Sequence, residues 1–411
     1  MKAIILLIPA TSYRTKAFLD AVKENGFRPV IVTNSLNNFL RDVIHVDNFS
    51  SNQVPYLLNA LSNYQIQGVL AVDELGLELQ VALSSNLGLK NSHSLQGVKA
   101  SKNKLLTRTV LSEHGFDQPK FISFNHSNFS IKSEISDDFV GLLGDTIGFP
   151  CVVKPVGLNG SRGITRIDRP QEIEGAINTA ISNQESAGQQ RDRPIIFEEY
   201  IDGVEIALDL IVNNSQARSV GIFDKPHPLI GPYFEETIYV TPSTLNKELQ
   251  EQLLELAFRG AQVLGLNFGP VHMEMRINSK GIYIIDVASR TIGGRCSSVI
   301  EFESETILES LLIQNLTSST LPRFELSKTC RGVVMLPIPK SGILSNVKGV
   351  EEAKKIAGVT EVDITVSPGD SVCAVPDADR YIGFGFAKGP NQSTVVDSLN
   401  KVIDTITFVI K

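Results

Sequence analysis

A lysine followed by a glycine-rich loop is the segment of this sequence with the clearest chemical potential. Lys154 lies at the end of an apolar run, and the loop that follows contains Gly157, Gly160, Ser161 and Gly163. Glycines let backbone N–H groups approach an anion closely, and a nearby lysine neutralises phosphate charge. No Gly-Lys-Ser/Thr triplet closes the loop, so it is not a Walker loop. The segment predicts a phosphate-binding loop, with a mobile surface hairpin as the alternative.

Two carboxylates on neighbouring strands form a second candidate site. Glu274 lies in one apolar run and Asp286 in the next, with the turn Asn278–Gly281 between them. Antiparallel strands joined by a short turn can place such residues opposite each other on one face. Facing carboxylates in apolar surroundings are costly without a cation, and their oxygens suit Mg²⁺ held jointly with nucleotide phosphates. The alternative is a structural ion pair with Arg276 or Arg290.

A third group of residues could recognise a nucleoside. An apolar strand ends in Glu198 and Glu199, and Tyr200, Ile201 and Glu205 follow around an Asp-Gly turn. Backbone after a strand can hydrogen-bond an adenine edge, and a carboxylate such as that of Glu205 can accept hydrogen bonds from ribose hydroxyls. A solvated hairpin turn is the alternative interpretation.

An arginine close to two glycines forms a fourth group. Arg290 offers a planar, bidentate fork for a carboxylate or a phosphate. Gly293 and Gly294 would let a substrate approach main-chain N–H groups closely. The alternative is an ordinary Gly-Gly turn.

The elements that must position these residues fall into three regions. The first region alternates apolar strands with helical stretches and predicts a small, doubly wound parallel sheet. No GxGxxG follows its first strand, so a dinucleotide site is not supported. Four segments define this region: strands at Ala3–Ile8, Pro29–Thr33 and Gly68–Val72, and a helix at Thr15–Asn25.

The rest of the chain mixes helices and strands. A helix is predicted over Ser101–His114, a polar surface insertion over Asn125–Asp138, and a last helix over Val395–Phe408. We predict an α/β and α+β protein of three domains: an α/β domain of residues 1–98, an α+β core of residues 99–322 and a small α+β cap of residues 323–411.

Composition excludes several classes of protein. The 411 residues hold 38 Lys and Arg against 45 Asp and Glu, and the net charge of −7 argues against a nucleic-acid partner. The longest apolar run, Ala3–Pro9, is too short for a membrane helix or a secretion signal. The four cysteines are scattered, which indicates reduced thiols in a cytoplasmic protein.

Together, these motifs and their order resemble the ATP-grasp superfamily. The family's helical Lys-x3-Arg pattern matches Lys104 and Arg108, and its strand lysine matches Lys154. The resemblance implies an ATP-grasp fold, in which an N-terminal doubly wound domain precedes the nucleotide site and a small cap follows it. It also implies phosphate contacts from Lys104 and Lys154. The remaining nucleotide-binding positions implied are Gly160, Ser161, Glu198, Glu199, Tyr200, Ile201 and Glu205.

The run Asp286–Arg290 with its following Gly-Gly resembles the L-amino-acid ligase branch of that superfamily. The acidic segment before Pro242 also resembles that branch, in which Glu236 would face the substrate amine. Two departures are that Asp286 is shorter than the usual Glu and that Tyr239 stands where a His is common.

This resemblance implies an ATP-dependent carboxylate–amine ligase that forms an amide through an acylphosphate and releases ADP and phosphate. ATP and Mg²⁺ (or Mn²⁺) would be required, and the substrates would be small carboxylates and amines, in particular amino acids. Catalysis would fall to Arg290 and Lys154. The implied metal ligands are Glu274 and Asp286, and the implied substrate contacts are Glu236, Arg290, Gly293 and Gly294.

Two other functions stay open. The same fold could serve another acylphosphate reaction, such as that of glycinamide ribonucleotide synthetase or biotin carboxylase. A nucleotide-binding protein without turnover is the second alternative, although the retained lysines, acids and Arg290 argue against it. A homodimer is expected, with no membrane partner.

Overall fold

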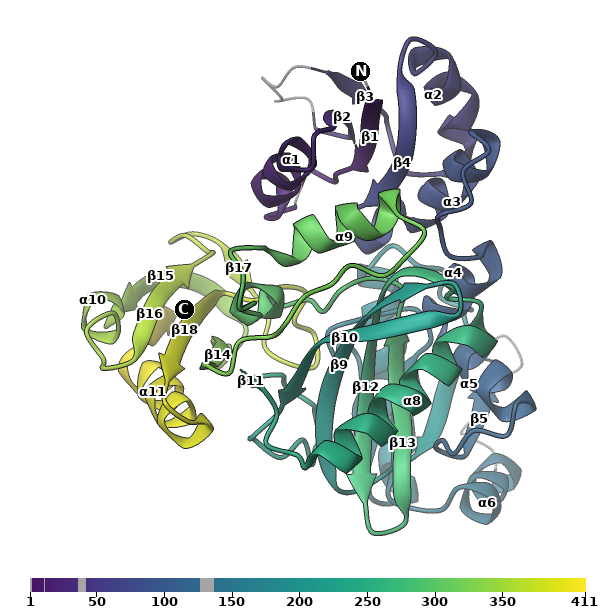
Figure 1. Ribbon diagram of the computed structural model, residues 1–411. Helices are drawn as coiled ribbons and strands as arrows, with labels where there is room; N and C mark the ends of the chain where they lie inside the picture. The colour runs from purple at the N-terminus through teal and green to yellow at the C-terminus, as the bar shows by residue number, and fades with distance from the viewer. Residues whose placement is uncertain (1, 11, 36–41, 126–136) are drawn as a thin grey trace.

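The N-terminal part is a four-stranded parallel sheet covered by helices on both faces. The computed structural model describes residues 2–10, 12–35, 42–125 and 137–411. The sheet has the order β3-β2-β1-β4 (Figure 1). Its elements are β1 (Lys2–Leu7), α1 (Thr15–Glu24), β2 (Arg28–Thr33), β3 (Val43–His45), α2 (Val54–Ala60), β4 (Gln65–Ala71) and α3 (Leu77–Asn86). The predicted doubly wound sheet is therefore confirmed.

Strand β1 is apolar and buried from Ala3 to Leu7. Ile4 and Leu6 pack into the core under α1, and Ile5 and Leu7 pack into a separate core with α2 and α3. A strand buried on both faces has no position left for a polar side chain. The first of these cores also contains α9 (Leu308–Thr317), so a helix from far along the chain covers the N-terminal sheet.

The helix predicted over Ser101–His114 is confirmed with a later start: it is α5 (Lys104–Glu113), and Ser101 ends the preceding helix α4 (Leu95–Ser101). The side chain of Asn103 accepts hydrogen bonds from the N–H groups of Leu105 and Leu106, so it caps the start of α5. This cap makes Lys104 the first residue of α5, and its side chain is buried.

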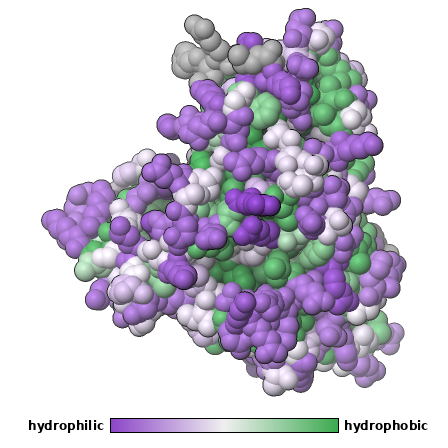
Figure 2. All heavy atoms as spheres, in the orientation of Figure 1, coloured by the Kyte–Doolittle hydropathy of each residue, from purple (hydrophilic) through white to green (hydrophobic). Residues whose placement is uncertain are grey.

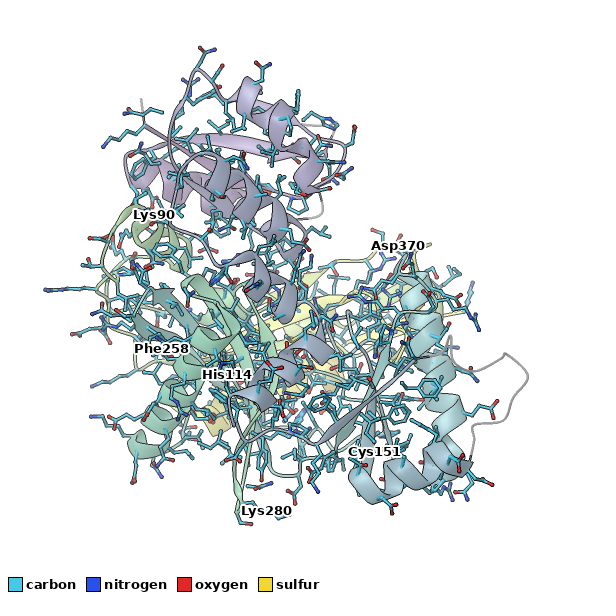
Figure 3. All side chains as sticks on the ribbon, turned by 90° about the vertical axis from the view of Figure 1, so that its right-hand side faces the viewer. Lys90, His114, Cys151, Phe258, Lys280 and Asp370 are labelled. Carbon is cyan, nitrogen blue, oxygen red and sulfur yellow. The ribbon has the colours of Figure 1, made fainter. Side chains whose placement is uncertain are left out.

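A small antiparallel sheet with the order β5-β8-β6-β7 carries the glycine-rich loop between β6 and β7. Figure 3 labels Cys151, which begins β6. Residues 126–136 of the predicted polar insertion lie outside the described residues. The elements are β5 (Phe121–Phe124), α6 (Asp137–Thr146), β6 (Cys151–Pro155), β7 (Thr165–Ile167), α7 (Ile173–Ser186) and β8 (Ile195–Glu199).

The large sheet has the order β13-β12-β9-β10-β11-β14-β18-β16, and helix α8 packs against its first strands (Figure 1). The β12–β13 hairpin ends near Lys280 (Figure 3). Strands from the predicted cap thus continue the sheet of the core. The elements are β9 (Val204–Asn213), β10 (Gln216–Asp224), β11 (Ile238–Thr241), α8 (Lys247–Leu264), β12 (Phe268–Asn278), β13 (Gly281–Ala288), β14 (Cys330–Met335), β16 (Val359–Ile364) and β18 (Gly383–Gly389).

The C-terminal part adds a three-stranded sheet with the order β17-β15-β19. The helix predicted over Val395–Phe408 ends at Thr405, because Thr407–Ile410 pairs with β15 as a strand. Cross-strand pairing overrides the helical pattern there. These elements are β15 (Gly342–Lys348), α10 (Val350–Ala353), β17 (Ser371–Val372), α11 (Gln392–Thr405) and β19 (Thr407–Ile410).

Hydrophilic residues cover most of the face drawn in Figure 2. Hydrophobic residues gather near its middle, where the C-terminal part meets the rest of the molecule. Among the described residues, every helix is too short or too polar to cross a bilayer.

Candidate active site

A single cavity gathers nearly all of the predicted site residues. It encloses about 1080 Å³, its open mouth included, between the small sheet, the large sheet and the C-terminal part. Fourteen predicted positions line it: Lys104, Lys154, Gly160, Ser161, Glu198, Glu199, Tyr200, Ile201, Glu205, Glu236, Glu274, Asp286, Arg290 and Gly293.

Gly294 is not among the residues that line this cavity, and its predicted contact with substrate stays a prediction. Its φ of +58° lies in the left-handed region, and a β carbon there would clash with the Met335 side chain. Glycine at this position therefore serves the packing of the turn.

Glu198 is the centre of a buried ion-pair cluster. Its carboxylate contacts Arg108 Nε at 2.7 Å and Lys154 Nζ at 2.6 Å, and all three side chains are almost fully buried. Burial alone would raise the pKa of Glu198, but the two cations outweigh it and lower the pKa to about 2. The predicted contact with an adenine edge concerns the backbone of Glu198–Ile201 and stays a prediction, whereas the Glu198 carboxylate is bound to Arg108 and Lys154.

Replacing Glu198 with Gln should lower the free energy of unfolding by about 3–5 kcal/mol at pH 7, because two buried cations lose their counter-charge. The folded-state pKa of about 2 lies below the ordinary 4.5. The stabilisation is therefore fully present above pH 4.5 and is lost as pH falls towards 2. Urea unfolding of both proteins at pH 7 and at pH 3.5 measures this difference.

The neighbouring change Glu199→Gln is the matched control, since the ion pairs of the described residues do not include Glu199. It should change the free energy of unfolding little at either pH. Equal stability of wild type and Glu198→Gln at pH 7 would show that the cluster contributes nothing to folding.

The glycine-rich loop presents free N–H groups to the cavity. Gly160 and Ser161 have φ of +62° and +56°, so two successive residues adopt the left-handed conformation. Within the described part of the chain, their N–H groups donate no hydrogen bond. Lys104 Nζ donates to the carbonyl of Leu158 in the same loop at 2.8 Å and lies 3.4 Å from Asp286 Oδ2. Unpaired N–H groups beside buried lysines fit an anion such as a nucleotide phosphate.

Glu274 and Asp286 are directly opposite each other across β12 and β13, as predicted. Neither pairs with Arg276 or Arg290. Lys225 Nζ lies 2.7 Å from Glu274 Oε1, and Lys104 approaches Asp286. Burial raises the pKa of Glu274, whereas the neighbouring lysines and Arg108 hold the pKa of Asp286 below its usual value in spite of burial.

The donor set fits Mg²⁺ only together with a phosphate-bearing ligand. Within the described ranges there is no group of three or more His, Cys, Asp or Glu residues that could hold a metal. Mg²⁺ is usually held by one or two carboxylates plus substrate phosphates, which is what this pair beside the loop could provide.

Glu205 has both carboxylate oxygens engaged. Lys225 Nζ contacts Oε1 at 2.6 Å, and Arg276 Nε contacts Oε2 at 2.7 Å. Burial opposes ionisation, but these two cations lower the pKa of Glu205 to about 2. A ribose hydroxyl that donates a hydrogen bond to Glu205 would therefore share this carboxylate with Lys225 and Arg276.

Arg290 reaches the cavity from the turn after β13 and is supported by residues that sequence reasoning missed. Its Nε lies 3.5 Å from Glu74 Oε2 in the N-terminal part, and Asn159 of the glycine-rich loop also donates to Glu74. Asp209 accepts a hydrogen bond from Ile292 N at 2.9 Å, which fixes the same turn. The sequence feature that could have identified Asp209 is a carboxylate within the otherwise apolar run that forms β9.

Glu236 lies at the end of the cavity nearest the C-terminal part. Its Oε2 accepts a hydrogen bond from the Tyr381 hydroxyl at 2.8 Å, so a residue beyond β17 completes the site. Tyr239 and Cys296 line the same end. Burial raises the pKa of the Cys296 thiol well above its usual value, so the thiol is neutral and inert, as expected for a buried cysteine.

Two family models match the chain. One, an ATP-grasp domain, matches residues 147–299, and the other, L-amino acid ligase C-terminal domain 2, matches residues 334–411. The chain contains an ATP-grasp domain. The first matched range holds the glycine-rich loop and the Glu274–Asp286 pair, and the second holds Tyr381.

Known proteins resemble this chain over all or part of its length. The crystal structure of an L-amino acid ligase from Bacillus licheniformis superposes with a TM-score of 0.81 at 20% identity, covering 100% of this chain and 99% of that one. The uncharacterized protein y4rH of Sinorhizobium fredii is 22% identical over 100% of this chain and 84% of its own length. A D-alanine–D-alanine ligase of Bacillus licheniformis is 26% identical, over 46% of this chain and half of its own length.

Proposed function

We propose that this protein is an ATP-dependent carboxylate–amine ligase that joins amino acids, or an amino acid and a related acid, through an acylphosphate. The observation that carries the proposal is that Arg290 and Glu236 line the same cavity as the glycine-rich loop and the Glu274–Asp286 pair. One cavity thus offers phosphate-binding donors together with a cation for a carboxylate and an anion for an ammonium.

The proposed roles follow from chemistry. A carboxylate is a poor electrophile, and transfer of the ATP γ-phosphate gives it a good leaving group. The incoming amine attacks the acylphosphate, an amide forms, and phosphate leaves. Lys154, Lys104 and the loop N–H groups orient the phosphates, while Arg290 stabilises the charge that develops on the carboxylate oxygens. Mg²⁺ bound at Glu274 and Asp286 would neutralise phosphate charge.

The test is ADP release with a panel of amino acids, offered singly and in pairs, followed by mass analysis of the product. We expect ADP release that depends on an amino acid, and a product with the mass of a dipeptide or related amide. ADP release that no member of the panel stimulates would overturn the proposal.

Replacing Glu236 with Gln should weaken binding of substrates that carry a free α-amine by roughly 1.5–3 kcal/mol, because one charged hydrogen bond is lost. A deamino analogue of the same acid should bind both proteins equally. KM for the matched pair of acids measures the difference. Glu255→Gln is the control, since Glu255 is exposed on α8 and does not line this cavity. An equal rise in KM for the two acids would mean that Glu236 does not recognise the α-amine.

The proposal also includes the domain division, the cellular compartment and the oligomeric state. The division into domains of residues 1–98, 99–322 and 323–411 is retained as a proposal, with α9 reaching back to the first of them. All four cysteines are free, which supports a reducing compartment such as the cytoplasm. The homodimer stays a prediction, and sedimentation velocity tests it.

A further inference from the structure

A second cavity adjoins the first at its Glu236 end. It encloses about 760 Å³, its mouth included, between the glycine-rich loop, strand β14 and the segment from Val375 to Tyr381. The two cavities are neighbours and share six lining residues: Leu158, Asn159, Gly160, Glu236, Met335 and Tyr381.

The interior of this second cavity is apolar. Met335, Leu336 and Ile338 of the C-terminal part are buried, and Val375 and Ala378 also line the space. The charged lining residues are two cations and three anions, and their net negative charge disfavours an acidic side chain: Arg162, Arg380, Glu235, Glu236 and Asp379. A concave site of this composition binds an apolar group.

The wall formed by the segment from Val375 to Tyr381 is fixed at three points. Gly163 N donates to the carbonyl of Pro376 at 2.8 Å, Asn183 Nδ2 donates to Asp377 Oδ1 at 2.7 Å, and Tyr381 donates to Glu236. Two of these bonds join the C-terminal part to the small sheet and its helix. The cavity is therefore built before any ligand arrives, which lowers the ordering cost of binding.

We propose that the second cavity binds the side chain of the amino acid whose carboxylate is activated, and that it selects apolar side chains. This inference rests on the proposed function. An α-amino acid with its carboxylate at Arg290 and its ammonium at Glu236 has its α carbon at the junction of the two cavities. The remaining substituent on that carbon is then directed into the apolar space beyond Met335.

The experiment isolates activation of the first substrate by offering hydroxylamine as the amine. Hydroxylamine attacks the acylphosphate, phosphate leaves, and the hydroxamate is measured as its ferric complex. KM is determined for L-leucine and for L-alanine in the wild type, in Ala378→Phe and in the matched control Ala378→Ser. Ala378 is half-buried at the wall, so phenylalanine there fills the space and serine does not.

We expect Ala378→Phe to raise the KM for L-leucine at least tenfold relative to that for L-alanine, and Ala378→Ser to leave the ratio unchanged. Ile338→Ala enlarges the cavity from the opposite side and should lower the KM for L-phenylalanine relative to L-leucine. This second variant keeps the inference testable if Ala378→Phe does not fold.

Unchanged ratios in both variants would overturn the inference while leaving the proposed function intact. The inference is also overturned if the variants change only the KM for the amine, because the cavity would then hold the second substrate. If the wild type forms no hydroxamate from any amino acid, the proposed function fails and the inference falls with it.

Discussion

Replacing Lys154 with Ala should lower ATP turnover by at least ~100-fold, the typical loss when one preorganised donor to developing charge is removed. Lys154 ends β6 at the entrance to the glycine-rich loop and is buried. Burial lowers the pKa of its ammonium, but Glu198 at 2.6 Å favours the charged form. Glu198 keeps Arg108 as a partner in the variant, so we expect the protein to fold.

The measurement is ADP release at saturating amino acid, together with circular dichroism to verify folding. Lys102→Ala is the matched control, because Lys102 pairs with Glu78 and does not line the cavity. The control should keep wild-type turnover. A folded Lys154→Ala protein with near-wild-type ADP release would refute the assignment of Lys154 to the phosphates.

The changes Glu274→Gln and Asp286→Asn should each raise the Mg²⁺ concentration needed for half-maximal activity by about tenfold or more, or abolish turnover. A neutral amide is a weaker ligand than a carboxylate for a hard cation. The two residues face each other across β12 and β13, so either substitution affects the same position between them.

Each of these amides also leaves a lysine with one anionic partner fewer, Lys225 in the first case and Lys104 in the second. A full Mg²⁺ titration is therefore needed: weaker metal binding shifts the half-maximal Mg²⁺ concentration, whereas an effect of the lysine on turnover alone lowers the activity at saturating Mg²⁺ and leaves that concentration unchanged. Glu361→Gln, at an exposed ion pair with Arg295, is the control. If both amide variants keep the wild-type Mg²⁺ dependence, the pair has a structural role.

Much of the fold and the candidate site follows from local sequence patterns. The alternation of short apolar strands with helices predicted the N-terminal sheet, and the turn after Asn278 predicted that Glu274 and Asp286 would face each other. The glycine spacing after Lys154 predicted a loop with unusual backbone angles, and Gly160 and Ser161 adopt them. These features depend on interactions between residues within about a dozen positions of each other, so local sequence patterns predict them.

The partners of these residues were decided by tertiary structure. Tyr381 reaches Glu236, Lys225 lies between Glu205 and Glu274, and Glu74 approaches Arg290. The first two contacts join strands or strand ends that the order of the large sheet brings together, and the third joins the N-terminal part to the turn after β13. A buried charge needs a counter-charge, and the packed fold determines which residue supplies it. The sequence by itself therefore determined most of the residues that line the candidate site, and the packing of distant strands decided which charges they meet and where the second cavity lies.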